Sequence, residues 1–583
     1  MCGVSVIYLA LLVPAGLVAD TELKIKRSET PPEFRDKTIR SIKIDIANVF
    51  DDPSNLIYRK ANELKFRTRE EVVRRELLFT EGDRYEQFLI DESLRVLRQT
   101  KYLRKVNITP KVDGDFVDIL ISCSDTWTFI PQVDYSTGDG RRRIAAGLGE
   151  SDLLGLGKRA EVLYEDDSSR QSIEAVYEDP RILGSEYRGL GAVFNRNDGN
   201  RVVFLLSDPF RTLLDERGWN LSTDVSDTVG RLFQNGDERF IYRQEKADLV
   251  FRYTVARGDP SANLSRFSLG YDYHDASFSP ADAQDFHDID LDPESVSHNN
   301  QRLLAEDRRY TGPSINYEYL HQDFISMNYI DRFERVEDYN LGDDFSINLL
   351  FAPTVLGSIE NAGLLSANQS RGWRFGNSSF LRGEIGAASR VNSQDFSDSL
   401  LRTELRYYNV LGPKYLGERF IGRHTLAASF FLDFGDDLDR DREFLIGGDN
   451  ALRGYKAKTF TGDKRAALNL EDRVHFVDDL FELVSIGGAV FLEAGGATPD
   501  PLGDLFSKRL YADAGVGLRI AFPRSSGERV LRIDLALPLR DGPDDSGAFE
   551  PRLLLSGGQL FGSRLRSETF GPEKASVEVG FDR

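Results

Sequence analysis

The sequence is poor in the residues that mark enzymes, disulfide-bonded domains and helical membrane proteins. Its 583 residues include only 2 cysteines, 2 methionines and 3 tryptophans. One stretch alone is long and apolar, residues 3–19, so no other segment predicts a membrane-spanning helix, which needs about 20 apolar residues. The histidines form no HExxH motif or paired metal spacing, and neither a Gly-x-Ser-x-Gly motif nor a phosphate-binding loop stands out. We therefore expect no enzyme, no metal site and no cofactor.

The apolar stretch at the N-terminus predicts a secretion signal. It ends in small residues and is followed by the polar Asp20-Thr21-Glu22, which is typical of a signal peptide at 1–19 cut near Ala19. No Lys or Arg precedes it, so a misassigned start or an N-terminal anchor remains an alternative. Removal of the signal leaves Cys123 as the single cysteine, which excludes an intrachain disulfide bond. Residues 20–35 are polar, contain two adjacent prolines and predict a linker.

The net charge of −21 is unevenly distributed. Residues 36–125 carry 17 acids and 17 bases, whereas residues 126–583 carry 74 acids and 53 bases. An acidic excess of this kind disfavours nucleic acid as a partner of the large C-terminal part. We attribute the excess to solvated acidic loops.

Residues 36–125 predict a small α/β module. Ile42, Ile44 and Ile46 alternate with polar residues and indicate a half-buried strand. Two amphipathic helices follow, one after Thr68 (with Glu71 as a capping box) and one over about 86–99. Two further strands, 103–109 and 116–122, are separated by an Asp-Gly turn. The expected order is therefore β-α-α-β-β.

Residues 126–561 predict a large transmembrane β-barrel. Apolar and aromatic residues alternate with polar ones over some 435 residues, as at 172–178, 314–319 and 401–407. A barrel with a lipid-facing exterior and a hydrated lumen explains both faces, and the mean hydropathy of −0.38 does not argue against it because only alternate residues face lipid. Short connections such as 166–169 contrast with the long acidic stretch 279–309. The length allows about sixteen strands.

A short motif lies near the end of this series of strands. Leu452, Arg453, Gly454 and Tyr455 form the core of residues 444–455. The guanidinium of arginine presents a planar set of donors that suits a carboxylate in a confined site. Glycine allows close approach of the backbone or a positive φ, and tyrosine adds packing and a hydroxyl group. The alternative is an arginine that points into solvent from an ordinary loop.

In this setting the motif resembles that of the BamA-like outer-membrane assembly family, which is related to two-partner secretion transporters. Residues 36–125, with Gly82-Asp83 and Tyr102-Leu103, resemble its POTRA domain, and residues 551–561 resemble its closing strand, beyond which 562–583 form a polar tail. The resemblance implies about sixteen strands and a loop arginine that pairs inside the barrel with an acidic residue. By position, the partners would be Glu471 and Glu493. The family usually has Asp in place of Glu493, so Glu471 is the candidate for the dominant partner.

The resemblance also implies a function in a bacterial outer membrane, with the POTRA domain in the periplasm. We expect a protein-assembly factor whose partners are the lipid bilayer, unfolded outer-membrane or secreted proteins and, as candidates, accessory lipoproteins. Clients would add to a strand edge at Ile42, Ile44 and Ile46. The barrel would open between a first strand near Arg143–Gly149 and a last strand near Leu553–Phe561. The alternatives are a two-partner-secretion-like translocator and a passive channel.

Overall fold

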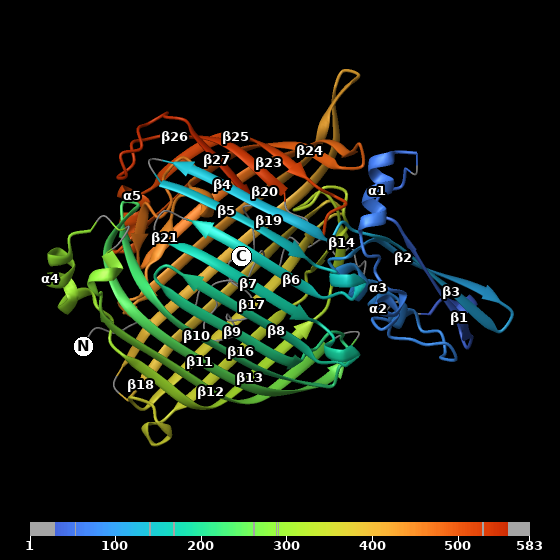
Figure 1. Ribbon diagram of the computed structural model, residues 1–583, viewed down its shortest axis with the longest axis horizontal. Helices are drawn as coiled ribbons and strands as arrows, with labels where there is room; N and C mark the ends of the chain where they lie inside the picture. Colours follow the sequence, from blue (N-terminus) through green and yellow to red (C-terminus); the bar gives the residue numbers. More distant parts are fainter. Residues whose placement is uncertain are drawn as a thin grey trace, which may run out of the picture.

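The computed structural model describes residues 30–557, except 53, 139–140, 167–169, 261–262, 287–288, 290, 394 and 527–529. The expected signal peptide, most of the linker, Phe561 and the polar tail lie outside the described residues. Figure 1 shows two parts, a small N-terminal module (residues 30–125, blue) and a large barrel whose one end carries the module. We call this end of the barrel the module-side end and the opposite end, near α4 and α5, the far end.

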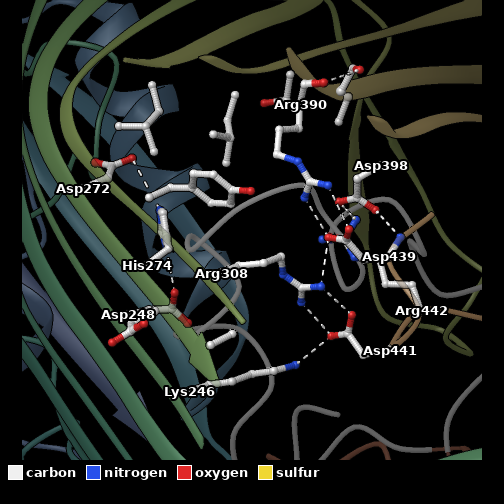
Figure 2. Close-up of a pocket in the computed structure, with 18 of the residues that line it drawn as sticks. Lys246, Asp248, Asp272, His274, Arg308, Arg390, Asp398, Asp439, Asp441 and Arg442 are labelled. Carbon is white, nitrogen blue, oxygen red and sulfur yellow. Dashed lines mark hydrogen bonds and ion pairs between the residues drawn. The ribbon is translucent and has the colours of Figure 1, made fainter. Parts of the chain in front are cut away.

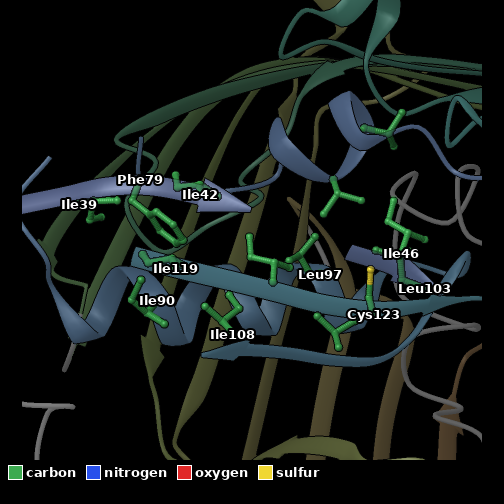
Figure 3. Packing of buried hydrophobic residues seen from close by; sticks show 14 of the residues in the cluster. Ile39, Ile42, Ile46, Phe79, Ile90, Leu97, Leu103, Ile108, Ile119 and Cys123 are labelled. Carbon is green, nitrogen blue, oxygen red and sulfur yellow. The ribbon is translucent and has the colours of Figure 1, made fainter. Parts of the chain in front are cut away.

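The N-terminal module is a three-stranded sheet against which two of its helices, α2 and α3, pack. Its elements are η1 (Pro32–Phe34), β1 (Thr38–Ala47), α1 (Leu56–Leu64), α2 (Glu70–Arg74), α3 (Gln87–Gln99), β2 (Leu103–Asp113) and β3 (Phe116–Asp125). The sheet order is β1-β3-β2, with β1 parallel and β2 antiparallel to β3. The helix α1 is additional to the expected order. Figure 3 shows the apolar core, where Ile42 and Ile119 of the sheet pack with Leu97 of α3.

The expected capping box at Thr68 is wrong. Helix α2 begins one residue later than that motif requires, with Arg69 at the N-cap position and no side-chain cap. The hydroxyl of Thr68 instead lies between the buried carboxylates of Asp125 and Asp152, 2.8 Å from Asp152 Oδ2. The Thr68 hydroxyl, which the local sequence predicts as the cap of the helix, is therefore used for a contact with the barrel instead.

The barrel closes through strands in chain order. The described residues contribute twenty strands, β4–β13, β16–β20 and β23–β27, and the last, β27, lies beside the first, β4. Their bounds are β4 (Phe129–Gly138), β5 (Arg141–Glu150), β6 (Arg159–Asp166), β7 (Gln171–Asp179), β8 (Arg188–Arg196), β9 (Gly199–Asp208), β10 (Arg217–Gln234), β11 (Asp237–Asp259), β12 (Asn263–Pro280), β13 (Arg308–His321), β16 (Asp344–Ala352), β17 (Ala362–Phe375), β18 (Ser379–Asn392), β19 (Phe396–Leu416), β20 (Arg419–Asp436), β23 (Lys464–Leu480), β24 (Val484–Thr498), β25 (Tyr511–Ala521), β26 (Val530–Pro538) and β27 (Arg552–Gly557). The estimate of about sixteen is too low because β4–β9 have only 8 to 10 residues each.

Alternation along the strands separates a polar lumen from an apolar exterior. On β23 the side chains of Glu471 and Arg473 point inward and are buried, whereas Leu468 and Leu470 are exposed on the outer face. The predicted transmembrane barrel fold is confirmed. In the part of the chain that the structure describes, no helix combines the length and the apolar character needed to cross a bilayer.

The position of the closing seam differs from the expectation. Arg143–Gly149 lies in β5, which pairs with β4 on one side and β6 on the other. The strand beside β27 is β4. The first strand was missed because β4 begins at Phe129, only four residues after the module ends.

The two ends of the barrel carry different connections. The far end holds α4 (Pro293–Leu303), α5 (Leu502–Lys508) and the strand pair β21 (Phe444–Ile446) with β22 (Phe460–Gly462). The module-side end holds the strand pair β14 (Phe324–Met327) with β15 (Glu337–Asn340), seen beside the module in Figure 1. The remaining short helices are η2 (Leu153–Gly155), η3 (Ile182–Gly184), η4 (Ala283–Phe286), η5 (Thr354–Leu356) and η6 (Gly448–Asn450).

Candidate functional site: the lumen loop and its anchors

The connection between β20 and β23, residues 437–463, enters the barrel from the far end, and we call it the lumen loop. Its two arms pair as β21 and β22, and the motif lies between them. Leu452 and Tyr455 are fully buried in an apolar cluster with Phe431 of the barrel wall. Ala451 and Leu452 have φ values of 140° and 61°, so the backbone turns sharply just before the arginine.

Arg453 is 1% exposed and is held by two strands of the wall. Its Nε donates to Glu493 Oε1 at 3.0 Å, its backbone N–H donates to Glu493 Oε2 at 2.7 Å, and its Nη1 donates to Asp534 Oδ2 at 2.8 Å. Its guanidinium also lies 3.4 Å from the ring centroid of Phe491. Glu493 and Phe491 belong to β24 and Asp534 to β26, so one side chain joins both strands to the loop.

Gly454 and Tyr455 complete the contact with the wall. Gly454 N–H donates to Asp513 Oδ2 at 3.0 Å, and a Cβ at position 454 would lie 2.7 Å from Asp513 Cβ and 2.8 Å from Pro538 N. The glycine is thus required for close approach rather than for a positive φ. The Tyr455 hydroxyl lies 3.1 Å from the carbonyl oxygen of Ala512 and 3.0 Å from that of Arg540.

Glu471 is not a direct partner of the loop arginine. In the described part of the chain no ion pair joins it to Arg453, and its Oε1 instead accepts from Arg519 Nη2 at 2.8 Å. Arg519 also pairs with Asp534, so Glu471 belongs to the same buried network as Arg453 but is connected to it through Arg519 and Asp534. The longer side chain of Glu493 reaches the guanidinium directly, and the expectation that Glu471 is the dominant partner is wrong.

A second set of ion pairs holds the start of the lumen loop on the other side of the lumen (Figure 2). Asp441 pairs with Arg308 of β13 at 2.8 Å, and Asp439 pairs with Arg390 of β18 at 2.9 Å. Lys246 of β11 reaches Asp441 at 3.5 Å. These pairs border a cavity of about 470 Å³. The loop is therefore fixed at its base to β11–β18 and at its tip to β24–β26.

The connection between β13 and β16, residues 322–343, folds into the module-side mouth of the barrel, and we call it the mouth hairpin. Its apolar residues Ile325, Ile330 and Leu341 pack against Phe380 and Tyr408 of the wall. Phe333 packs on the opposite side against Ala521 and Val530. A hairpin that contacts β18–β20 and also β25–β26 crosses the mouth.

Polar contacts join the mouth hairpin to both the module and the lumen-loop network. Arg335 Nη2 donates to the carbonyl oxygens of Thr100 and Leu103 in the module, at 3.5 and 3.4 Å. Arg473 Nη1 donates to Ile330 O at 2.6 Å and to Asp331 Oδ1 at 2.9 Å. The Nε of the same arginine lies 4.0 Å from Glu471 Oε2. A continuous series of charged contacts thus runs from the hairpin to Arg453.

The expected client edge on β1 is already occupied. Ile42 and Ile46 are buried in the module core, and Ile44 packs partly against it. The backbone N–H of Ile42 donates to Glu81, its carbonyl oxygen accepts from Arg74, and the carbonyl oxygen of Ile46 accepts from Arg67. The other edge strand, β2, shows no backbone hydrogen bond outside its sheet over residues 106–112 of the described chain.

Sequence reasoning missed Asp534, Asp513, the pairs around Asp441 and the mouth hairpin. Asp534 had a local signal, since it is the one acid in the apolar stretch LRIDLALPL and lies on the inward-facing side of the alternation. No local signal pairs Asp441 with Arg308, 133 residues away. Within the described residues, no group of three or more His, Cys, Asp or Glu side chains is placed to hold a metal ion.

Comparison with known proteins finds one family match and several similar structures. Residues 367–561 match the Omp85 superfamily domain. No curated protein sequence matches the chain. Among solved structures, BamA from Haemophilus ducreyi lacking POTRA domains 1–3 is 13% identical, with 90% of this chain and 84% of that chain covered and a TM-score of 0.38. CdiB from Acinetobacter baumannii is 12% identical (89% and 73% covered, TM-score 0.41), and CdiB from Escherichia coli is 10% identical (89% and 76% covered, TM-score 0.42).

Proposed function

We propose that the protein is an assembly factor that inserts β-barrel clients into the outer membrane of a bacterium, and the match of residues 367–561 to the Omp85 superfamily domain supports this proposal. The observation that carries the proposal is the buried anchoring of Arg453 to Glu493 and Asp534. It stiffens β24–β26, directly before the closing strand β27. A rigid wall on that side leaves the β27–β4 junction as the place where client strands enter.

The N-terminal module has the role of a POTRA domain in this proposal and lies in the periplasm. Its β2 edge, rather than β1, receives extended clients through main-chain pairing, because the backbone of β1 at Ile42 and Ile46 is already bonded. Accessory lipoproteins would bind the same module. Client folding supplies the free energy, so the proposal needs no nucleotide.

The mouth hairpin favours client assembly at the barrel wall over the two alternatives that use the lumen, a translocator and a passive channel. It crosses the module-side mouth, while the lumen loop enters from the far end. A translocator that passes a chain through the lumen would have to displace the hairpin from Phe380 and Tyr408 on one wall and from Ala521 and Val530 on the other. A passive channel would conduct ions steadily past it.

The test is folding of an unfolded outer-membrane barrel by the purified protein in liposomes. We expect faster client folding that is lost on deleting residues 36–125 and reduced in Arg453→Ala. Ion conductance should be low and should rise when a tight turn replaces residues 323–342, because that change removes the hairpin that crosses the mouth. A tight turn fits at this position because the backbone of His321 is already hydrogen-bonded to that of Asp343. Steady conductance by the unaltered protein without client folding would overturn the proposal in favour of a channel. Transport of one cognate secreted protein would favour the translocator.

A further inference from the structure

The hairpin that joins β19 and β20 extends beyond its neighbours. β18 pairs with β19 only as far as Asn409, and β23 pairs with β20 only from Arg423. Residues 411–422 pair with neither β18 nor β23, and we call them the rim ribbon. Near the turn, residues 414–416 pair with residues 419–422 of the returning strand, and Gly412 and Pro413 pair with His424 and Arg423 at the base. Figure 1 shows a hairpin in the corresponding gold colour projecting outward from the barrel wall near the module-side end.

Glycines and bulges turn the rim ribbon away from the wall. Gly412 and Gly422 both have positive φ, 72° and 130°, and the pairing of β19 with β20 shifts register beside Gly412 and again after Lys414. A Cβ at position 422 would lie 2.3 Å from Val474 Cγ1 of the adjacent strand, so only glycine fits where the ribbon leaves the sheet. Bulges of this kind bend and twist a strand pair.

The rim ribbon exposes apolar and aromatic side chains together with basic ones. Leu416 is 75% exposed and Tyr415 is 61% exposed, and Leu411, Phe420 and Ile421 are also exposed. Lys414 and Arg419 are exposed among them, together with one acid, Glu418, at the turn. A two-stranded ribbon with no third strand is marginally stable in water. Aromatic rings beside basic side chains are the usual composition of segments that lie at a membrane interface.

The apolar surface of the ribbon continues into the outer face of the barrel. Gly422 at its base lies against Phe476 of β23, whose ring is exposed on the outside. Further along β23 and its turn, Phe481 and Leu483 are exposed at the same module-side rim. Val490 and Leu492 carry this outward row along β24. The ribbon thus extends the lipid-facing surface sideways at the rim.

We propose that the rim ribbon lies flat in the headgroup region of the module-side leaflet and anchors the barrel at that interface. Tyr415, Leu416 and Phe420 contact the boundary of the acyl chains, and Lys414 and Arg419 contact lipid phosphates. The hydrated headgroup region suits the ribbon because its two unpaired strand edges need hydrogen-bond partners that the hydrocarbon core does not supply. The inference rests on the membrane-spanning barrel and on no property of a client.

The test places a fluorescent probe on the ribbon of the full-length protein. Leu416→Cys and Phe420→Cys, made with Cys123→Ala and Cys2→Ser, are labelled with an environment-sensitive dye. The protein is reconstituted in vesicles of phosphatidylethanolamine and phosphatidylglycerol that contain nitroxide-labelled phosphatidylcholine. The matched control is Phe116→Cys, since Phe116 is 44% exposed against 41% for Phe420 but lies at the turn between β2 and β3.

We expect blue-shifted emission at 416 and 420, strong quenching by the nitroxide lipid and little quenching by aqueous iodide, with the reverse pattern at 116. Iodide quenching at 416 and 420 equal to that at 116 would overturn the inference. Protection that appears only after addition of an unfolded client would also overturn it and would make the ribbon a client contact. Either result leaves the client-folding activity to be judged by its own assay, so the two proposals fail separately.

Discussion

Nη1 of Arg453 lies 2.8 Å from Oδ2 of Asp534, a contact between residues 81 positions apart in the chain. Asp534 is on β26, the neighbour of the closing strand, and it also binds Arg519. Because both arginines share one buried carboxylate, the tip of the lumen loop and the inner wall beside the seam form a single polar unit.

Asp534→Asn should loosen the tip of the lumen loop. The change removes the carboxylate between two buried guanidinium groups, and loss of one partner of a buried pair costs about 3–5 kcal/mol. We expect a lower temperature for loss of the compact barrel on electrophoresis and new protease cleavage within residues 447–459. Asp500→Asn is the control, because its pair with Arg509 is about half exposed and such pairs contribute about 0–1 kcal/mol. Equal behaviour of the two variants would contradict the prediction.

Gly454→Ala should displace the motif from the wall although it adds only one methyl group. The new Cβ would meet Asp513 Cβ at 2.7 Å and the backbone of Pro538 at 2.8 Å, and neither can move without shifting a strand. Overpacking of this kind costs about 1–3 kcal/mol. The control is Gly503→Ala, where a Cβ would have no neighbour within 4 Å. Unchanged protease resistance and client folding in Gly454→Ala would show that the close approach is dispensable.

The two anchors of the lumen loop should depend on each other. Asp439→Asn made together with Asp441→Asn removes the pairs with Arg390, Arg308 and Lys246 at the base, and Arg453→Ala removes those at the tip. Either the base variant or the tip variant leaves the loop held at one end, so their combination should lose more protease resistance than the sum of the two losses. The measurement is the cleavage rate within residues 447–459 for all four proteins. A strictly additive result would mean that base and tip are independent.

The junction of module and barrel should loosen as the pH rises toward neutrality. Burial raises the pKa of Asp152 to about 6, even though Thr68, the Gly157 N–H and Lys65 favour its ionised form. A carboxyl whose pKa is raised on folding stabilises the fold below its ordinary pKa, near 3.8, and this contribution is lost as the pH rises through about 6.

Hydrogen exchange at residues 65–69, corrected for its intrinsic pH dependence, is the measurement of that change. Protection should fall between about pH 4 and pH 7 in the unaltered protein and stay level in Asp152→Asn. Asp118→Asn is the control, because hydrogen bonds from Arg40 and Ser41 lower the pKa of Asp118 to about 2, below the pH range of the experiment. The same fall in protection in Asp152→Asn would assign the titration to another group.

Much of the fold follows from local sequence patterns. Alternation of period two places Leu468 and Leu470 on the outer face of β23 and Glu471 and Arg473 on its inner face. The same alternation holds wherever a strand separates two environments. The strands of the module and the helices α2 and α3 follow from equally local patterns, whereas α1 was not expected. The failure at Thr68 shows the limit, since its buried partners Asp125 and Asp152 are 57 and 84 residues away.

The sequence by itself determines an alternating barrel, a preceding α/β module and an arginine motif that requires a carboxylate. The tertiary structure alone decides which carboxylates serve it, that twenty strands close with β4 beside β27, and that the β1 edge is occupied. The reason is physical. Which side of a strand faces lipid depends on residues two apart, whereas the partner of Arg453 depends on strand register and barrel closure summed over the whole chain.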